Sequence, residues 1–376
     1  MTIPGESNMN SQQITALVVA LVVLVTTSAA EETGTTVISG LNGPMGVLVA
    51  GDGHVLVIDT GIGGDDEVML PHPLSGQTVG YGYGESARIV HLDPESGEQR
   101  NIANLSSWYF EPGIGNAGGA RLALLDGTIY ATVGGFSEDL LPLMASVIRI
   151  DDDGRAVPIA NAGEFERTTN PDGLSLESNP YGLSIGPDGN LWMVDTAGNS
   201  LVKVNPRTGE MELVTVFDGV SSPIPHPNRG GVLETDPAPT GIAFDGEGNA
   251  YVSFLPGIPF VPGSAKVVRV GVDGEVSDYA TGLTMITDLR RGPDGFFYAV
   301  SFGEFTDQGA IPNSGAIVLV REGTVSEKVL GGLSFPTSID FSTAGDAYVS
   351  INGIGAPGTG EVVMYKGLAS ATRSDP

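Results

Sequence analysis

Short apolar segments recur along the chain in pairs, and each pair is joined by a turn that contains glycine. The clearest copies are GPMGVLVAGDGHVLVID (43–59), NPYGLSIGPDGNLWMVD (179–195), APTGIAFDGEGNAYVSF (238–254) and FPTSIDFSTAGDAYVS (335–350), with weaker copies at 116–133 and 285–301. In all six copies a small or polar residue stands seven positions before the turn glycine. These residues are Gly46, Ala120, Gly182, Gly241, Asp288 and Ser338. The constant spacing predicts six repeats of one β-hairpin.

A second pair of apolar segments follows each of the first five hairpins. Examples are SLVKVN (200–205) with MELVTVF (211–217), and KVVRVG (266–271) with VSDYATGL (276–283). Apolar and polar residues alternate along SLVKVN and KVVRVG, which is typical of β-strands. Short turns such as PRTG and VDG join the members of each pair. Four antiparallel strands per repeat make a propeller blade, so the sequence predicts an all-β fold, a six-bladed β-propeller.

The sixth repeat lacks a fourth strand at its C-terminal end. Residues 360–367 (GEVVMYKG) supply its third strand, and the chain then ends in LASATRSDP. The segment TTVISGLNGP (35–44) carries a Gly-Leu step like that of the outer strands in the fourth and fifth repeats. We therefore expect 35–41 to pair with 360–366, which completes the last blade and closes the ring. The predicted propeller spans 31–367, and 368–376 are predicted to be a disordered tail.

An apolar run precedes the propeller. Residues 14–25 (ITALVVALVVLV) are followed by TTSAA and Glu31. This run is shorter than the roughly twenty residues that span a membrane, and Ser28 and Ala30 are the small residues that signal peptidases require. The sequence therefore predicts a signal peptide over 1–30 and a secreted or periplasmic protein. Because no Lys or Arg precedes the run, an uncleaved membrane anchor is the alternative.

The composition limits the partners. The 376 residues include 45 acidic and 17 basic side chains, for a net charge of −28. Such a surface repels phosphate groups, which excludes nucleic acids and anionic membranes as partners. The sequence contains no Cys, so disulfides, Cys-ligated zinc, Fe–S clusters and thiol catalysis are also excluded.

Strand order within a blade divides the connections between two faces of the ring. The turns that join the first strand to the second, and the third to the fourth, are short and lie on one side, the tight-turn face. All long segments lie on the opposite side, the long-loop face. These segments are 60–86, 106–116, 134–145, 162–177, 219–237, 255–264, 303–315 and 352–359. Because binding residues concentrate on long loops held by a rigid scaffold, we expect this face to bind a small molecule or a protein.

Three aspartates are candidate metal ligands. Asp59 and Asp195 end the second strand of their repeats, and Asp288 replaces the small residue of an inner strand. Strand ends are well-fixed positions, so these carboxylates could converge at the axis and bind Ca²⁺, which prefers oxygen ligands. The alternative for Asp59 and Asp195 is a structural cap, in which each carboxylate accepts hydrogen bonds from backbone N–H groups of the following loop.

Four further residues are candidate ligand-binding groups. Arg290 lies on an inner strand, where it could meet an anionic ligand or pair with Asp288. His72 and His226 each stand between two prolines on long loops. Either could act as a general base, although neither has an identifiable partner in the sequence. Trp108 belongs to the segment SSWYFEPG, where it could stack on a flat ligand or pack the loop down.

The hairpin pattern resembles NHL-type propeller repeats. More closely, the six hairpins, the Gly-Leu junctions and the opening VISGLNGPMGV resemble the ScyD/ScyE family of secreted bacterial propellers, named after the gene cluster for the pigment scytonemin. This resemblance covers 35–366 and implies an accessory protein of scytonemin-like secondary metabolism that binds its ligand on the long-loop face. The alternatives are an extracellular or periplasmic enzyme on a small aromatic or lactone substrate, with Ca²⁺ as candidate cofactor, and a passive scaffold.

A more distant resemblance is to six-bladed lactonase-type metallohydrolases. It implies an axial Ca²⁺ held by Glu, Asn and Asp. This sequence departs from that pattern, because the matching inner-strand positions are mostly Gly, Ala or Ser.

Overall fold

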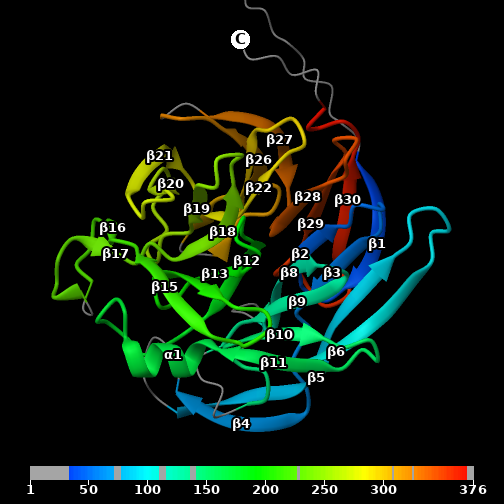
Figure 1. Cartoon of the computed structure of the whole chain (residues 1–376), viewed down its shortest axis with the longest axis horizontal. Coiled ribbons are helices and arrows are strands. Elements are labelled where there is room, and N and C mark those ends of the chain that lie inside the picture. The colour runs from blue at the N-terminus through cyan, green and yellow to red at the C-terminus, as the bar shows by residue number, and fades with distance from the viewer. Residues whose placement is uncertain are drawn as a thin grey trace, which may run out of the picture. The chain divides into compact units, whose positions relative to one another are not determined.

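Six antiparallel sheets form the blades of a β-propeller, which confirms the predicted fold (Figure 1). The computed structural model describes residues 34–71, 78–109, 116–135, 141–226, 229–306, 309–323 and 326–370. The predicted signal peptide (1–30) lies outside these residues. Within them, no helix is both long and apolar enough to cross a membrane.

Each blade contains four strands, and the first strands of neighbouring blades contact one another around the axis. Blade 1 consists of β2 (Pro44–Val49), β3 (Val55–Asp59), β5 (Thr78–Leu92) and β6 (Gln99–Tyr109). Blade 2 consists of β8 (Gly119–Leu125), β9 (Thr128–Val133), β10 (Ser146–Ile150) and β11 (Ala156–Asn161). Blade 3 consists of β12 (Pro180–Ile185), β13 (Leu191–Asp195), β14 (Ser200–Val204) and β15 (Met211–Val216).

The last three blades repeat this order, and the final one draws on both ends of the chain. Blade 4 consists of β18 (Pro239–Phe244), β19 (Ala250–Phe254), β20 (Ala265–Val270) and β21 (Val276–Leu283). Blade 5 consists of β22 (Ile286–Arg291), β23 (Phe297–Ser301), β26 (Gly315–Val320) and β27 (Glu327–Leu333). Blade 6 consists of β28 (Ser338–Phe341), β29 (Ala347–Ile351), β30 (Gly360–Tyr365) and β1 (Thr35–Leu41).

The ring closes as predicted. Strand β1 pairs antiparallel with β30, with Thr35 opposite Met364 and Leu41 opposite Gly360. In Figure 1 the blue N-terminal strand lies beside the red C-terminal one. The ordered chain continues past the predicted boundary, because Leu368 and Ala369 are buried in the last interface. The prediction of a disordered tail from residue 368 is therefore wrong for these two residues.

The hydrophobic core is divided among the interfaces between blades. Six clusters of described residues each join two neighbouring blades. In one of them, Ile58 of blade 1 packs with Leu122 of blade 2. Close packing of the inner strands also explains the small residue of each repeat: a Cβ added to Gly46 would lie 2.6 Å from the carbonyl oxygen of Ala120.

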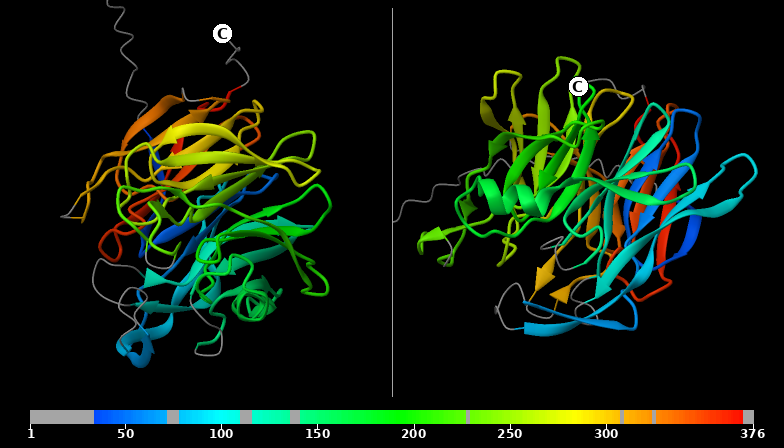
Figure 2. Two further views of the ribbon diagram at one scale, coloured as in Figure 1. Left: turned by 90° about the vertical axis from the view of Figure 1, so that its left-hand side faces the viewer. Right: turned by 60° about the horizontal axis from the view of Figure 1, so that its bottom comes forward.

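The long segments add secondary structure that the repeat pattern did not predict. These elements are β4 (Asp66–Pro71), β7 (Asn116–Ala117), α1 (Ala162–Thr169), β16 (Val220–Ser221), β17 (Glu234–Thr235), β24 (Phe305–Thr306) and β25 (Gly309–Ala310). In the right-hand view of Figure 2, the blue β4 and the orange β24–β25 pair project from the same side of the ring. Strands β5 and β6 are longer than predicted, because β4 and β7 pair with their extensions.

Candidate functional site

Arg121 fills the axis of the ring. Its side chain is fully buried, and its guanidinium donates to the backbone oxygens of Met45, Thr287 (2.6 Å) and Thr337 (2.8 Å). The Cζ atom also lies 4.4 Å from the centre of the Tyr181 ring, within cation–π range. Arg121 of blade 2 therefore contacts the inner strands of blades 1, 3 and 5 and the residue that precedes the inner strand of blade 6.

Asp288 is committed to the same network. One carboxylate oxygen lies 3.5 Å from Nε of Arg121, and the other accepts hydrogen bonds from Ser338 Oγ (2.6 Å) and the backbone N–H of Ile339 (3.2 Å). Burial opposes ionisation of Asp288, but the guanidinium groups of Arg121 and Arg290 outweigh it and lower the pKa of the carboxyl. Asp288 is thus an ionised partner of arginine.

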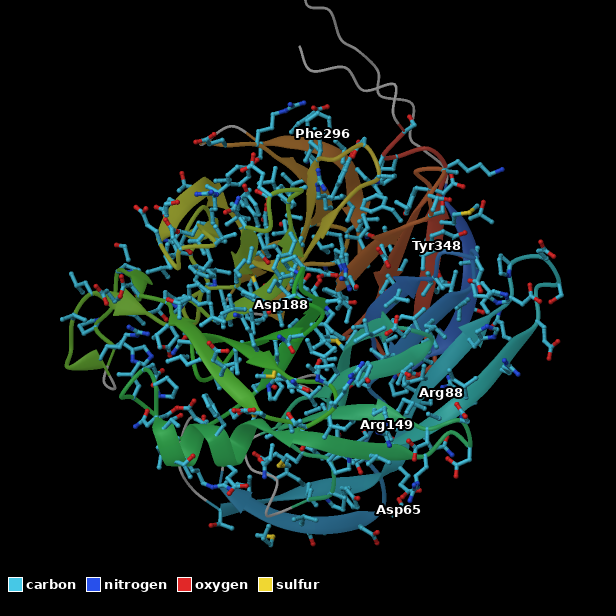
Figure 3. All side chains as sticks on the ribbon, viewed as in Figure 1. Asp65, Arg88, Arg149, Asp188, Phe296 and Tyr348 are labelled. Carbon is cyan, nitrogen blue, oxygen red and sulfur yellow. The ribbon has the colours of Figure 1, made fainter. Side chains whose placement is uncertain are left out.

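Asp59 caps the seam where the ring closes. It is fully buried and accepts hydrogen bonds from the backbone N–H groups of Asn42 (3.0 Å) and Gly43 (2.8 Å), which follow β1. Its second oxygen pairs with Nε of Arg88 at 3.1 Å, a residue labelled in Figure 3. These contacts correspond to the predicted structural cap: Gly61 of the following loop also donates, at 3.5 Å, but the shorter backbone hydrogen bonds come from the preceding segment.

Asp195 forms a cap of the same kind in blade 3. It accepts hydrogen bonds from Ser178 Oγ (2.5 Å) and from the backbone N–H groups of Asn179 (2.7 Å) and Gly198 (3.0 Å). Burial raises the pKa of Asp195, against the effect of these donors.

The structure does not bring Asp59, Asp195 and Asp288 together, as the predicted Ca²⁺ site requires. The three carboxylates belong to blades 1, 3 and 5 and have separate partners. Across the described ranges, no three His, Asp or Glu side chains are arranged to hold a metal ion. Because the guanidinium of Arg121 supplies the positive charge at the axis, the residues there do not fit the axial Ca²⁺ that the lactonase resemblance implies.

Of the two histidines predicted to bind a ligand, the structure describes one. His72 lies outside the described residues. His226 has a partner that the sequence did not reveal: its Nε2 lies 3.4 Å from a carboxylate oxygen of Asp236. The other oxygen of Asp236 accepts hydrogen bonds from Arg229 Nε (2.8 Å) and Asn199 Nδ2 (3.3 Å). His226 thus belongs to a polar network that ties the 219–237 segment to blade 3.

Glu166 is a buried acid that sequence reasoning missed. It lies on α1, has 1% of its surface exposed, and its Oε1 has no hydrogen-bond partner. Burial, followed by the negative charges of Asp195 and Asp172, raises its pKa to about 8. Glu166 is therefore protonated at neutral pH. Glu166 lies beside the Asp195 cap, whose charge contributes to this shift, so we assign it to the scaffold.

Trp108 and Arg290 occupy different environments. Trp108 is 1% exposed and packs in the core between blades 1 and 2 with Tyr81 and Met144. The packing alternative therefore describes Trp108, and its ring is not available to a ligand in this structure. Arg290 lines a pocket on the tight-turn face, opposite the face on which the sequence placed the site.

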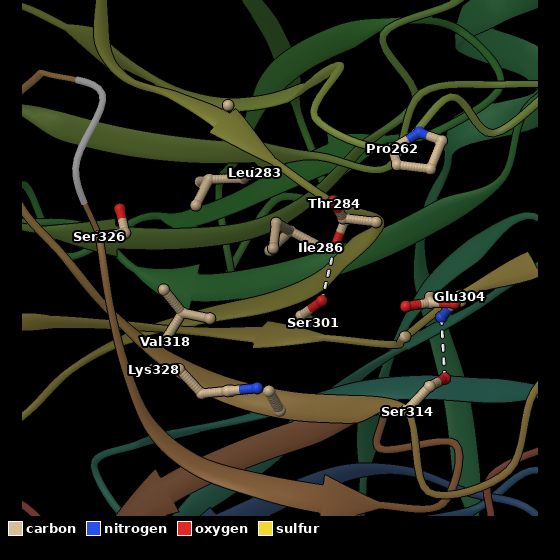
Figure 4. A pocket seen from close by; sticks show the side chains of 13 residues that line it. Pro262, Leu283, Thr284, Ile286, Ser301, Glu304, Ser314, Val318, Ser326 and Lys328 are labelled. Carbon is tan, nitrogen blue, oxygen red and sulfur yellow. Dashed lines mark hydrogen bonds between the residues drawn. The ribbon is translucent and has the colours of Figure 1, made fainter. Parts of the chain in front are cut away.

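A cleft runs between blades 4 and 5, from the 303–315 loop on the long-loop face to the β26–β27 turn on the tight-turn face. Its volume is about 540 Å³, which lies within the range of small-molecule sites. Leu283 and Ile286 form an apolar side, and Figure 4 shows Val318 and Lys328 across the space from them. Glu304, on the 303–315 loop, lies at one end of the view.

Three polar groups of this cleft lack partners among the described residues. The hydroxyl of Ser326 is buried and makes no hydrogen bond. The side chains of Glu304 and Lys328 are exposed and form no ion pair or hydrogen bond with another described residue. By contrast, Ser301 Oγ donates to the Thr284 carbonyl (2.8 Å). The cleft thus offers an unpaired carboxylate, an unpaired ammonium group and an unpaired hydroxyl beside an apolar wall.

Comparisons with known proteins identify the fold. No protein-family model matches the chain, and no curated protein is significantly similar to it in sequence. Among solved structures, it is similar to a gluconolactonase from Xanthomonas campestris, with a TM-score of 0.51 and 13% identity over 88% of both chains. A putative gluconolactonase gives 0.52 and 14% over 90% of this chain and 93% of the other.

A third structure is described in different terms. It is a putative oxidoreductase (glucose dehydrogenase) from Thermus thermophilus, with a TM-score of 0.50 and 16% identity over 88% of this chain and 99% of the other. The structural neighbours therefore include gluconolactonase-type propellers, and at these identities the similarity establishes the fold alone. These comparisons do not show the ScyD/ScyE family.

Proposed function

We propose that this chain binds a small organic molecule in the cleft between blades 4 and 5. The observation that carries the proposal is the set of unpaired polar groups, Glu304, Ser326 and Lys328, beside an apolar wall in a cleft of about 540 Å³. Buried polar groups normally have partners within the protein or in ordered water, so an unpaired buried hydroxyl such as that of Ser326 points to a bound group.

The chemistry of the lining defines the class of ligand. Lys328 favours a carbonyl or carboxylate oxygen, and Glu304 favours a hydroxyl group of the ligand. Leu283, Ile286 and Val318 favour a compact apolar or ring-shaped body. A hydroxylated lactone or a phenolic acid meets these requirements.

Ligand-dependent stabilisation tests this proposal. The midpoint of thermal unfolding is measured with glucono-δ-lactone, gluconate and 4-hydroxybenzoate. A binding compound at about ten times its Kd adds about 1.4 kcal/mol to the free energy of unfolding. We expect Glu304→Gln and Lys328→Gln to lose this gain. Glu327→Gln, an exposed neighbour on β27, is the control and should keep it. Equal stabilisation of all four proteins would reject the cleft as the site.

Hydrolysis of a lactone in the same cleft is a second candidate function. Two of the structural neighbours are described as gluconolactonases, which supports the enzyme alternative more than the accessory-protein one. In this proposal the Glu304 carboxylate takes a proton from water as the water oxygen bonds to the lactone carbonyl carbon. Lys328 stabilises the oxyanion, the ring C–O bond then breaks, and the proton passes from Glu304 to the leaving oxygen.

A proton-release assay on glucono-δ-lactone tests this step. Because the axis is filled by Arg121, we expect EDTA to leave the rate unchanged. Glu304→Gln should lower the rate by about 10²-fold or more, and Glu327→Gln should not. Loss of activity in EDTA, or an active Glu304→Gln variant, would contradict this proposal while leaving ligand binding to be judged by the unfolding experiment.

Export is proposed on the evidence of residues 14–25 alone. Sequencing the N-terminus of the protein from its native host should give Glu31, and retention of residues before Ser28 on a cytosolic protein would reject it. The accessory role in scytonemin-like metabolism is likewise supported only by the quoted sequence motifs.

A further inference from the structure

A second polar pocket opens at the axis on the tight-turn face. It has a volume of about 300 Å³ and is lined by the ends of the inner strands of blades 1, 2 and 3, together with Arg290 of β22 and Asp340 of β28. Arg121 and its hydrogen bonds fill the axis between the inner strands. We call this pocket the axial vestibule, and it shares no lining residue with the cleft of the proposed function.

Arg290 is the unusual residue of the axial vestibule. Its side chain is only 14% exposed, yet none of its nitrogens forms a hydrogen bond with a described residue, and Nε and Nη2 are shielded from solvent. The nearest carboxylate oxygen, on Asp288, is 3.9 Å from Nε, too long for a hydrogen bond. Arginine carries five N–H donors, and leaving them unpaired in a buried position is costly.

The neighbouring carboxylates are already occupied. Asp288 is held by Arg121 and Ser338. Asp340 accepts hydrogen bonds from the backbone N–H groups of Val49 (2.8 Å) and Phe341 (3.0 Å). Neither carboxylate therefore accepts a hydrogen bond from Arg290. Among the described residues no other acceptor reaches its guanidinium, so an acceptor would have to occupy the pocket that Arg290 lines.

We infer that the axial vestibule binds the carboxylate group of a small organic acid through Arg290. A planar carboxylate matches the guanidinium fork and can accept two of its N–H donors at once. Burial raises the pKa of Asp340, which makes its carboxyl easier to protonate and reduces its repulsion of the ligand. The two positive charges of Arg121 and Arg290 offset the charge of Asp288 and that of the bound acid.

Titration with carboxylic acids tests the inference. Formate, acetate and benzoate are added to the full chain, and binding is followed by saturation-transfer NMR, with acetamide as the uncharged control compound. We expect saturable binding of at least one acid and none of acetamide. Arg290→Gln should weaken that binding by at least about tenfold, and Arg290→Lys, which keeps the charge without the fork, by less.

Arg291→Gln is the matched control. Arg291 is the next residue of β22, but it is exposed and donates to the carbonyl of Gly295 in its own turn. Its variant should bind the acid as the parent does. The inference is overturned if the parent binds none of the acids, if acetamide binds equally well, or if the Arg290 and Arg291 variants lose the same affinity. Circular dichroism of each variant confirms that it is folded.

Discussion

The axis and the cleft between blades 4 and 5 both contain charged side chains, but the two regions pair them differently. At the axis, the guanidinium of Arg121 has backbone acceptors on three other blades, and Asp288 has Arg121, Ser338 and Ile339. In the cleft, Glu304 and Lys328 have no partner among the described residues.

This difference distinguishes charged side chains that stabilise the fold from those that are available to bind a ligand. Removing one partner of a buried charged pair leaves the other charge buried and unpaired, which lowers the free energy of unfolding. A charge without internal partners contributes little to stability and remains available to a ligand. By this criterion the axial carboxylate of Asp288 is structural, and the cleft is the better candidate for binding.

The largest effect is expected at the axis. Arg121→Met removes the hydrogen bonds that join the inner strands and leaves Asp288 buried without its main partner. We expect it to lower the free energy of unfolding by about 3–5 kcal/mol, measured by urea denaturation. The double variant Arg121→Met/Asp288→Ser, which places in blade 5 the residue that blade 6 has at Ser338, should recover part of the loss. A single variant as stable as the parent would contradict the structural role.

Glu166 provides a test that depends on pH. Its pKa is about 8 in the folded chain, against an ordinary value of 4.5, so the folded state binds more protons than the unfolded state between these values. Stability therefore falls as pH rises through this window, by about 1.4 kcal/mol per pH unit. The side chain introduced by Glu166→Gln cannot ionise. The free energy of unfolding of this variant, relative to that of the parent, should therefore increase by roughly 3 kcal/mol between pH 5 and pH 8.

Glu164→Gln is the control for that experiment. Glu164 is exposed on the first turn of α1, so its removal should change stability by no more than about 0.5 kcal/mol and by a similar amount at both pH values. Parallel pH profiles for the parent and Glu166→Gln would show that Glu166 ionises normally.

A smaller loss is expected at the seam. Asp59→Asn places an amide N–H₂ where backbone N–H groups of Asn42 and Gly43 donate, and it weakens the pair with Arg88. We expect a loss of about 2 kcal/mol in the free energy of unfolding. Asp65→Asn, on the exposed start of the β4 hairpin, should change it by less than about 0.5 kcal/mol. Equal effects of the two substitutions would contradict the capping role.

Most of the fold could be predicted from the sequence because the same packing requirement recurs in successive blades. Five of the six repeats have a small residue where neighbouring inner strands approach closely, as at Gly46, and all six have a turn glycine at a fixed distance from that position. The Gly-Leu step of 35–44 identified the closing strand for the same reason. The helix α1 and the extra strands were missed because they occur once each and leave no repeating pattern.

The site could be predicted only in part. Asp288 was recognised as unusual, but its pairing with Arg121 of blade 2 depends on the ring bringing distant segments together, which spacing within one repeat does not encode. The cleft is assembled from five strands, β21, β22, β23, β26 and β27, and the loops beside them. Glu304 and Lys328 belong to no motif. The buried state of Trp108 follows from the unpredicted extension of β6.

The free energy of unfolding of a triple cleft variant tests the central contrast most directly. Glu304→Gln, Ser326→Ala and Lys328→Gln are combined and compared with the parent and with Arg121→Met in one series of urea denaturation curves. Because these groups have no internal partners, we expect the triple variant to lie within about 0.5 kcal/mol of the parent, while Arg121→Met loses several times more. A triple variant destabilised by about 2 kcal/mol or more would show that the cleft groups hold the fold together, and would contradict the account.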